Sequence, residues 1–243
     1  MAYHGWDEVA YVLIDGVDIA TVLTSLAFEH EATLTEKHFA GNEYPTAIAT
    51  GTSRGAIEIG TVLNSPTTDD VAATSGTGKA ISVLYSGNTV GELCAIFPSV
   101  KVGKVGVTAT PDDIHSLAPE FTNSGEAYLL GRVVAALAAR VADGDTESAP
   151  CDLGASNEIA AGKAVLHVTD CTLGGYDNVV VKLRDSDDDI TYADHTTFTA
   201  VTAAGAESKT LATATERYLA ISWAWTGAGS DQTFTGYVGI GAD

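Results

Sequence analysis

The feature that most limits how this chain can fold is a series of short apolar runs, each closed by turn residues. Beyond residue 158 the runs follow one another at about 8–12 residues, which is the spacing of strands in a β-sandwich. Turn signals such as Gly174-Gly175 and Ser186–Asp189 separate them. The pattern predicts a small β-sandwich domain, immunoglobulin-like or jelly-roll-like, with strands at 163–168, 179–184, 196–199, 208–211, 217–225 and 233–240.

The first part of the chain carries the same kind of signal. One short helix is predicted at 68–75, because Thr68 can cap its start and Gly76 can end it. Residues 32–51 show no regular periodicity and contain several turn residues, so we expect a long loop there. The remaining apolar runs alternate at strand period and predict strands at 11–19, 24–31, 55–63, 81–85, 92–97 and 101–109.

Two neighbouring segments set the expected domain organisation. Residues 142–158 are polar, acidic and turn-rich, which makes them the best boundary between a domain at 1–150 and a second one at 151–243. Residues 129–141 carry apolar side chains at helical spacing, although Gly131 and its β-branched neighbours also fit a strand. The expected fold class is mainly β, with one short helix in the first domain.

The charge of the chain is its most unusual bulk property. It contains 32 Asp and Glu against 12 Lys and Arg, a formal net charge of −20, and no basic cluster. Proteins that hold nucleic acid need clustered positive charge, so a role in gripping DNA is disfavoured. An acidic surface instead suits a channel that DNA must slide past, or adaptation of a protein to high salt, and both explanations stay open.

Membrane and secretion signals are missing from the sequence pattern. No apolar run reaches the ~20 residues that cross a bilayer, so we expect no membrane insertion. The first residues lack a basic region followed by an apolar stretch, so we expect a chain that is made and folded inside a cell. The thiols of Cys94, Cys151 and Cys171 share no metal-ligand spacing. At least one buried free thiol is expected, and a Cys151–Cys171 disulfide remains an alternative.

Catalytic motifs are also missing. The six histidines form no metal-ligand pattern, and there is no G-x-S-x-G, phosphate-loop or dinucleotide motif, so neither an enzyme nor a cofactor is expected. One dense carboxylate cluster follows the run at 179–184. It could hold Ca²⁺ through oxygen ligands, but it lacks the glycine and the distal glutamate of an EF-hand loop, and a solvated turn is favoured. Its members are Asp185, Asp187, Asp188 and Asp189.

Two tryptophans in the second domain allow two interpretations. Trp223 and Trp225 lie two residues apart, so their side chains share one side of a strand. Packing in the core of the sandwich is the favoured interpretation. The alternative is an exposed aromatic platform that binds sugar.

Several short motifs, taken in order, resemble those of tail tube proteins of tailed viruses. Residues 11–18, YVLIDGVD, and 23–28, LTSLAF, resemble the hairpin and the strand that open these proteins. Residues 35–59, with EYPT before the strand that begins at Gly51, resemble the family's long loop and the strand that leaves it. Residues 112–121, DDIHSLAPEF, and 131–134, GRVV, resemble the last two strands. The likeness covers about residues 9–135 and implies a strand at 129–134, which leaves a helix expected only at 135–141.

The C-terminal part resembles the accessory β-sandwiches that are appended to virion proteins. The motifs are VKLRDS at 181–186, YAD at 192–194, FTAV at 198–201 and RYLAI at 217–221. Together the two resemblances imply a tail-tube β-sandwich or barrel followed by a decoration domain.

The resemblance implies a major tail tube subunit of a phage or an archaeal virus. Six copies would form a ring, and stacked rings would form a tube whose acidic lumen conducts viral DNA without binding it specifically. The partners would be other copies of the chain and the proteins at the tube ends, in a virion tail assembled in the host cytoplasm. The loop at 32–51 would reach a neighbouring subunit through Thr35, Lys37, Phe39, Glu43 and Tyr44.

The alternative function is surface decoration. In that case the chain would cover the capsid or the tail, and its C-terminal sandwich would bind a host surface or a glycan.

Overall fold

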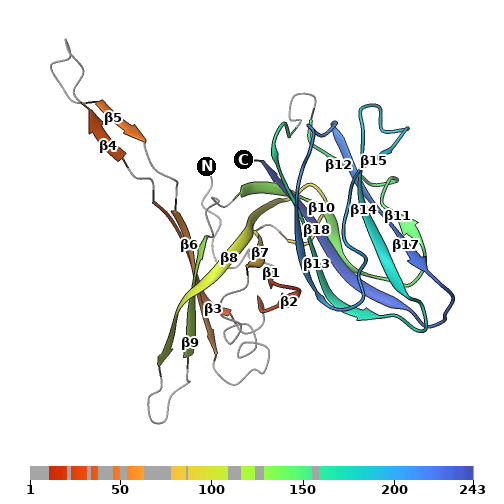
Figure 1. Cartoon of the computed structure of the whole chain (residues 1–243), viewed down its shortest axis with the longest axis horizontal. Coiled ribbons are helices and arrows are strands. Elements are labelled where there is room, and N and C mark those ends of the chain that lie inside the picture. The colour runs from red at the N-terminus through yellow and green to blue at the C-terminus, as the bar shows by residue number, and fades with distance from the viewer. Residues whose placement is uncertain are drawn as a thin grey trace. The chain divides into compact units, whose positions relative to one another are not determined.

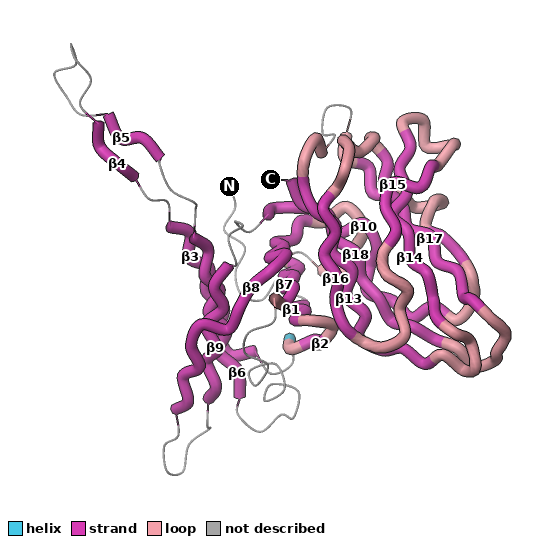
Figure 2. The backbone as a smooth tube through the Cα atoms, in the orientation of Figure 1, coloured by secondary structure: helices cyan, strands magenta, loops and turns pink. Residues whose placement is uncertain are grey.

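The computed structural model describes residues 11–20, 23–31, 34–37, 46–49, 54–62, 78–85, 87–108, 116–123, 129–154 and 159–242. Figure 2 shows that these residues form strands joined by loops. One position, Ala20, is in a 3₁₀ conformation, and none of the described residues lies in an α-helix. The expectation of a mainly β fold is therefore confirmed. The short helix expected at 68–75 lies outside the described residues. The strands are β1 (Tyr11–Ile14), β2 (Val17–Asp18), β3 (Leu23–Glu31), β4 (Leu34–Lys37), β5 (Thr46–Ala49), β6 (Arg54–Val62), β7 (Lys79–Leu84), β8 (Leu93–Thr108), β9 (Ser116–Asn123), β10 (Leu129–Arg140), β11 (Gly144–Asp145), β12 (Cys151–Asp152), β13 (Gly162–Thr172), β14 (Asn178–Ser186), β15 (Ala193–Thr197), β16 (Gly205–Thr210), β17 (Tyr218–Thr226) and β18 (Thr233–Ala242).

The contacts within the chain divide it into two compact units. Unit 1 comprises residues 1–22, 79–98 and 129–243, and unit 2 comprises residues 23–78 and 99–128. These bounds differ from the expected boundary at 150/151, because segments from both sides of residue 150 belong to unit 1. Truncation at residue 150 tests the sequence-based division into domains at 1–150 and 151–243.

Unit 1 contains two sheets that face each other across one core. The larger sheet runs in the order β16-β13-β18-β10-β8-β7-β1-β2, and the smaller one in the order β11-β17-β14-β15, with β12 also paired to β17. Figure 1 shows β10, β18 and β13 on one side of this core and β14 and β17 on the other. In β14 every second side chain from Val179 to Asp185 is buried, as expected for a strand with one face on the core. The sandwich expected beyond residue 158 is thus present, and β10 of the preceding segment belongs to its larger sheet.

The helix expected at 135–141 is wrong, because β10 is a strand up to Arg140. The ladder between β10 and β18 shifts register between Val133 and Ala135 and again between Ala135 and Ala138. Such bulges interrupt the period of two, and here they leave Val133, Val134 and Ala135 buried in succession. An irregular strand of this kind produces the apolar spacing that resembles a helical stripe. The strand that the resemblance implied at 129–134 is confirmed.

Unit 2 contains an antiparallel sheet and a separate pair of strands. In the sheet β6 lies between β3 and β9, and β9 also pairs with β8. The segment 32–51, expected to be a loop, is partly regular, because Leu34–Lys37 pairs with Thr46–Ala49 as β4 and β5. That expectation was wrong for these eight positions. A four-residue strand is too short to show a clear apolar period, so the sequence pattern did not reveal this pair.

Arg140 is the last residue of β10, and its side chain is buried in the core of unit 1. Its guanidinium carbon lies 4.9 Å from the ring centroid of Trp223 and 5.4 Å from that of Phe234. The guanidinium donates to the carbonyl of Gly236 on β18 at 2.7 Å and to two carbonyls of its own strand. Burial lowers its pKa to about 10. Arg140 therefore connects β10, β17 and β18.

We expect Arg140→Ala to lower the free energy of unfolding by about 3 kcal/mol, since a buried carbonyl loses its donor and two cation–π contacts are lost. Urea unfolding followed by tryptophan fluorescence would measure the loss. Arg132 is the matched control, because it lies on the same strand, is exposed, and donates to the Gly91 carbonyl at 2.9 Å. Arg132→Ala should cost no more than about 0.5 kcal/mol. Similar losses in both variants would contradict the role assigned to Arg140.

Candidate functional site

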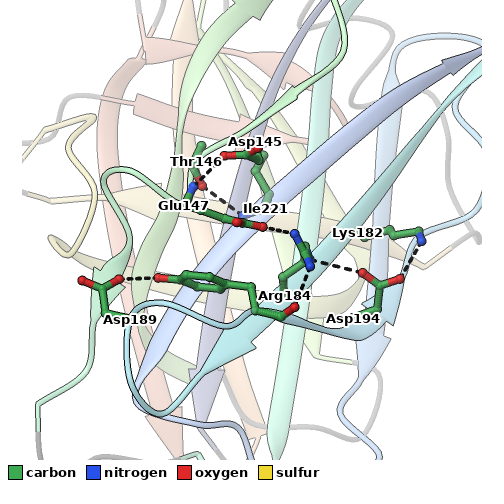
Figure 3. Close-up of polar contacts among 9 residues, drawn as sticks. Asp145, Thr146, Glu147, Lys182, Arg184, Asp189, Asp194 and Ile221 are labelled. Atoms are coloured by element: carbon green, nitrogen blue, oxygen red, sulfur yellow. Dashed lines mark hydrogen bonds and ion pairs between the residues drawn. The ribbon is translucent and has the colours of Figure 1, made fainter.

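A network of charged side chains lies on the outer face of the smaller sheet of unit 1. Figure 3 shows Arg184 of β14 between Glu147 and Asp194. Its Nη1 forms an ion pair with Glu147, and its Nε lies 3.3 Å from the Oδ1 of Asp194. Its Nη2 donates to the carbonyl of Tyr192 at 2.6 Å. Lys182 also contacts Asp194, with Nζ 2.6 Å from Oδ2. Two cations therefore neutralise the Asp194 carboxylate.

The opposite side of β14 carries a buried acid–base pair at its end. Asp185 Oδ2 accepts a hydrogen bond from His195 Nδ1 at 2.8 Å and another from the Glu216 backbone N–H at 3.1 Å. The side chain of His195 is 5% exposed, and its Nε2 has no hydrogen-bond partner. His195 reaches Asp185 because the ladder between β14 and β15 shifts register between Leu183 and Arg184, which leaves His195 as the unpaired residue of a bulge.

An open cleft lies over this pair. Its volume is about 530 Å³, and its walls come from the ends of β14 and β15 and from the loop that precedes β17. No lysine or arginine is among the described residues that line it. They are Asp185, Ser186, Asp187, Thr191, Ala193, Asp194, His195, Thr213, Ala214 and Glu216.

The four aspartates of the expected calcium candidate have separate roles. Asp185 holds His195, as described above. Asp188 Oδ1 accepts hydrogen bonds from the N–H groups of Thr191 and Ile190, at 2.8 and 2.9 Å, and from a serine hydroxyl, and these bonds lower the pKa of Asp188. Asp189 adopts a φ of 58° and accepts from the Tyr192 hydroxyl at 2.5 Å. Asp187 is exposed and lines the cleft. In the part of the chain that the structure describes, no three His, Cys, Asp or Glu side chains are placed to hold a metal ion.

Most of the residues that were predicted to contact a neighbouring subunit lie outside the described residues. Thr35 and Lys37 lie on β4. Phe39, Glu43 and Tyr44 lie outside the described residues. Their proposed role stays a prediction.

A buried histidine cluster was not found by sequence reasoning. His167 of β13 has no exposed surface. Its Nδ1 accepts from the backbone N–H of Gly16 at 3.3 Å, which leaves Nε2 as the donor to Ser82 Oγ, 3.0 Å away. Burial lowers the pKa of His167 to about 3. The three residues are far apart in the sequence and belong to no motif, so only the fold could reveal the cluster. Because Ser82 is also fully buried, this serine–histidine contact is structural.

Trp223 and Trp225 pack as core residues. Trp225 is buried, and its ring lies 5.9 Å from that of Phe234. Trp223 contacts the same phenylalanine ring at 6.3 Å, and its Nε1 donates to the Ala142 carbonyl. The geometry favours core packing over an exposed platform for sugar.

The cysteines are free thiols. Cys94 and Cys151 are buried and Cys171 is half-buried, so the alternative Cys151–Cys171 disulfide is not formed. The part of the chain that the structure describes contains no helix long and apolar enough to cross a membrane.

No protein-family model matches the sequence, and no curated protein matches it. A chain from the virion of a native gene transfer agent particle is 12% identical with a TM-score of 0.41, covering 52% of this chain and 97% of that one. A chain from the tail of an empty gene transfer agent particle is 13% identical with a TM-score of 0.41, covering 51% and 96%. The SPP1 Dit protein is 9% identical with a TM-score of 0.35, covering 95% and 98%. All three TM-scores lie below 0.5.

Proposed function

We propose that this chain is a structural protein of a tailed-virus tail and, more specifically, a major tail tube subunit. The observation that carries the proposal is the order of strands along the first 135 residues. The motifs that resemble tail tube proteins fall on a hairpin (β1–β2), a long strand (β3), the strand that follows the loop (β6) and two final strands (β9 and β10). This is the order that the resemblance implies.

In the proposed assembly six subunits form a ring and rings stack into a tube. Sheet edges expose unpaired backbone groups, and closing a sheet between subunits removes those edges. Head-to-tail contacts between copies give a closed ring within one level and an open stack between levels. The β4–β5 pair and the segment between these strands would reach a neighbouring subunit. Other tail proteins would bind the tube ends in the virion, after assembly in the host cytoplasm.

The net charge of −20 supports a conduit for DNA. Viral DNA carries one negative charge per ~1.7 Å of helix, so an acidic lumen would let it pass without adhesion. We propose no catalytic role. The serine and histidine that contact each other, Ser82 and His167, are fully buried and out of reach of a substrate.

The test is assembly of the purified protein. We expect rings or tubes of uniform width by negative-stain electron microscopy, and more of them as salt screens the repulsion between acidic subunits. A protein that forms neither rings nor tubes at any salt concentration would argue strongly against a tube subunit.

Surface decoration is the second candidate function, and the open cleft of about 530 Å³ favours it, because a cleft can hold a ligand. Antibody labelling of virions separates the two candidates. Regular label along the whole length of the tail supports the tube subunit with its appended domain outside. Dense label on intact capsids supports decoration.

A further inference from the structure

Three exposed side chains share one face of the paired strands β8 and β10 in unit 1. Leu93 is 46% exposed and Leu130 is 61% exposed. Leu93 lies opposite Arg132 in the ladder, and Leu130 is two positions from Arg132 along β10. Opposed and diagonal residues of an antiparallel pair point to the same face and lie within about 7–8 Å of each other. We call Leu93, Leu130 and Arg132 the β8–β10 patch.

The patch borders the core between the two sheets of unit 1. Ile240 of β18, which lies opposite Arg132 on the other side of β10, is buried in that core. Val134, two residues beyond Arg132, is buried in the same core. Single exposed apolar residues are common on protein surfaces, whereas adjacent ones at the rim of a core mark a surface that a partner can cover.

Arg132 gives the patch a positive charge in a strongly acidic chain. Its Nη1 donates to the Gly91 carbonyl at 2.9 Å, which fixes the position of the guanidinium. None of the ion pairs between described residues includes Arg132. The chain has 32 Asp and Glu against 12 Lys and Arg, so a second copy offers far more anionic than cationic surface to this guanidinium.

The turn between β14 and β15 has the complementary character. Ile190 in this turn is 81% exposed. It directly follows Asp187, Asp188 and Asp189, which are all exposed. Asp188 Oδ1 accepts hydrogen bonds from the N–H groups of Ile190 and Thr191, at 2.9 and 2.8 Å. These bonds hold Ile190 in place before a partner arrives, so its backbone loses little conformational entropy on contact.

From these two surfaces we infer that the β8–β10 patch of one copy binds the Ile190 turn of a second copy. Ile190 packs against Leu93 and Leu130, and the Arg132 guanidinium pairs with the carboxylate of Asp187. Both surfaces are exposed in the same chain, so they do not cover each other within it. The inference rests on the proposed function for its partner, since a tube subunit contacts its own copies.

This contact joins different surfaces of the two copies, so it is heterologous. Each copy in such a series keeps a patch for one neighbour and a turn for the other, and the series closes into a ring or continues as an open filament. The contact is small. Closure of a ring strengthens it, because every copy then makes two contacts and the last of them forms within one assembly.

The experiment is sedimentation velocity of the full chain over a range of concentrations at one fixed ionic strength. Arg132→Glu places a carboxylate against Asp187 of the next copy, and Asp187→Arg places a guanidinium against Arg132. Each variant alone should self-associate about tenfold more weakly than the wild-type chain, because like charges then face each other. An equimolar mixture of the two variants should recover wild-type association, because alternating copies place opposite charges at every contact.

Matched controls make the same kinds of change outside both surfaces. Lys101→Glu and Asp170→Arg alter the charge of exposed residues by the same amount. Val141→Ser removes an apolar side chain that is 64% exposed. All three controls should associate like the wild-type chain. Leu130→Ser and Ile190→Ser, which remove the apolar part of the contact, should associate about tenfold more weakly.

Three results would overturn the inference. The first is a wild-type chain that does not self-associate. The second is equal weakening in the controls, which would mean general repulsion between acidic chains. The third is a mixture of Arg132→Glu and Asp187→Arg chains that associates no better than either variant alone, which would mean that the two surfaces do not meet.

Failure of this contact is distinguishable from failure of the proposed function. Tubes that form equally well from wild-type and Arg132→Glu chains would reject the contact and leave the tube subunit standing. Head-to-tail association that recovers in the mixture, but gives neither rings nor tubes by microscopy, would keep the contact and reject the tube.

Discussion

A chain that ends at residue 150 is expected to lose the cooperative unfolding transition of unit 1. The truncation removes β18, which pairs with β10 from Gly131 to Arg140, and β13, which pairs with β18 in turn. It also uncovers apolar side chains of the retained strand, among them Val133 and Val134, which are fully buried in the whole chain. Burial of one such side chain contributes about 1.5–3 kcal/mol, and a domain is stable by only about 5–15 kcal/mol in total. The truncated unit should therefore be unfolded or loosely collapsed.

Circular dichroism and urea titration of the truncated and full chains would measure this effect. The complementary fragment, 151–243, retains both sheets of the sandwich through β13, β14, β17 and β18, and serves as the matched control. It should keep more structure than 1–150. A cooperative transition of the 1–150 fragment, with native strand content, would contradict the expectation and support the domain boundary that the sequence predicts.

The stability of the full chain is expected to fall as the pH drops below about 6.5, because of one residue. His167 has a pKa of about 3 in the folded protein, lowered by burial, whereas an unfolded chain gives histidine its usual value. At a pH between the folded and unfolded pKa of His167, the unfolded state binds a proton that the folded state does not. The free energy of unfolding therefore decreases as the pH falls through this window, by up to about 1.4 kcal/mol per pH unit. Above the window His167 is neutral in both states and makes no contribution to the pH dependence.

His167→Gln isolates this contribution from those of the many carboxylates. Glutamine does not titrate, and its amide can accept from Gly16 and donate to Ser82 as the imidazole does. Between pH 7 and pH 4 the wild-type chain should lose about 3 kcal/mol more stability than the variant. The difference at pH 7 measures the change in packing alone. Parallel stability curves for the two proteins across this range would show that His167 is not buried as a neutral ring.

Local patterns were sufficient to predict most strands. The alternation of apolar residues in β14 and the turn dipeptide Asp15-Gly16 between β1 and β2 are properties of a few consecutive residues. They were visible because one face of each strand is buried. The strand β10 was partly misread because its bulges break that alternation, and β4 and β5 were missed because each has only four residues.

The candidate site was harder to predict from the sequence than the strands were. The aspartates at 185–189 form a cluster in the sequence, yet in the fold Asp185, Asp188 and Asp189 contact different partners and Asp187 is exposed. His195 and Glu216 carried no signal, because a histidine in a bulge and a backbone N–H from a loop leave no pattern in a sequence. The His167 cluster combines residues from β7, β13 and the β1–β2 turn, which no spacing rule connects.

The sequence by itself determined that this protein is built of strands, that its composition is strongly acidic, and the approximate positions of most strands. These are consequences of local periodicity and of composition, which need no knowledge of distant residues. Only the tertiary structure decided that β10 joins the C-terminal sandwich, that Asp185 meets His195 under an open cleft, and that His167 is sealed in the core. Each of these depends on pairing between strands that lie far apart in the chain, and the free energy of such pairing comes from packing that a linear pattern does not contain.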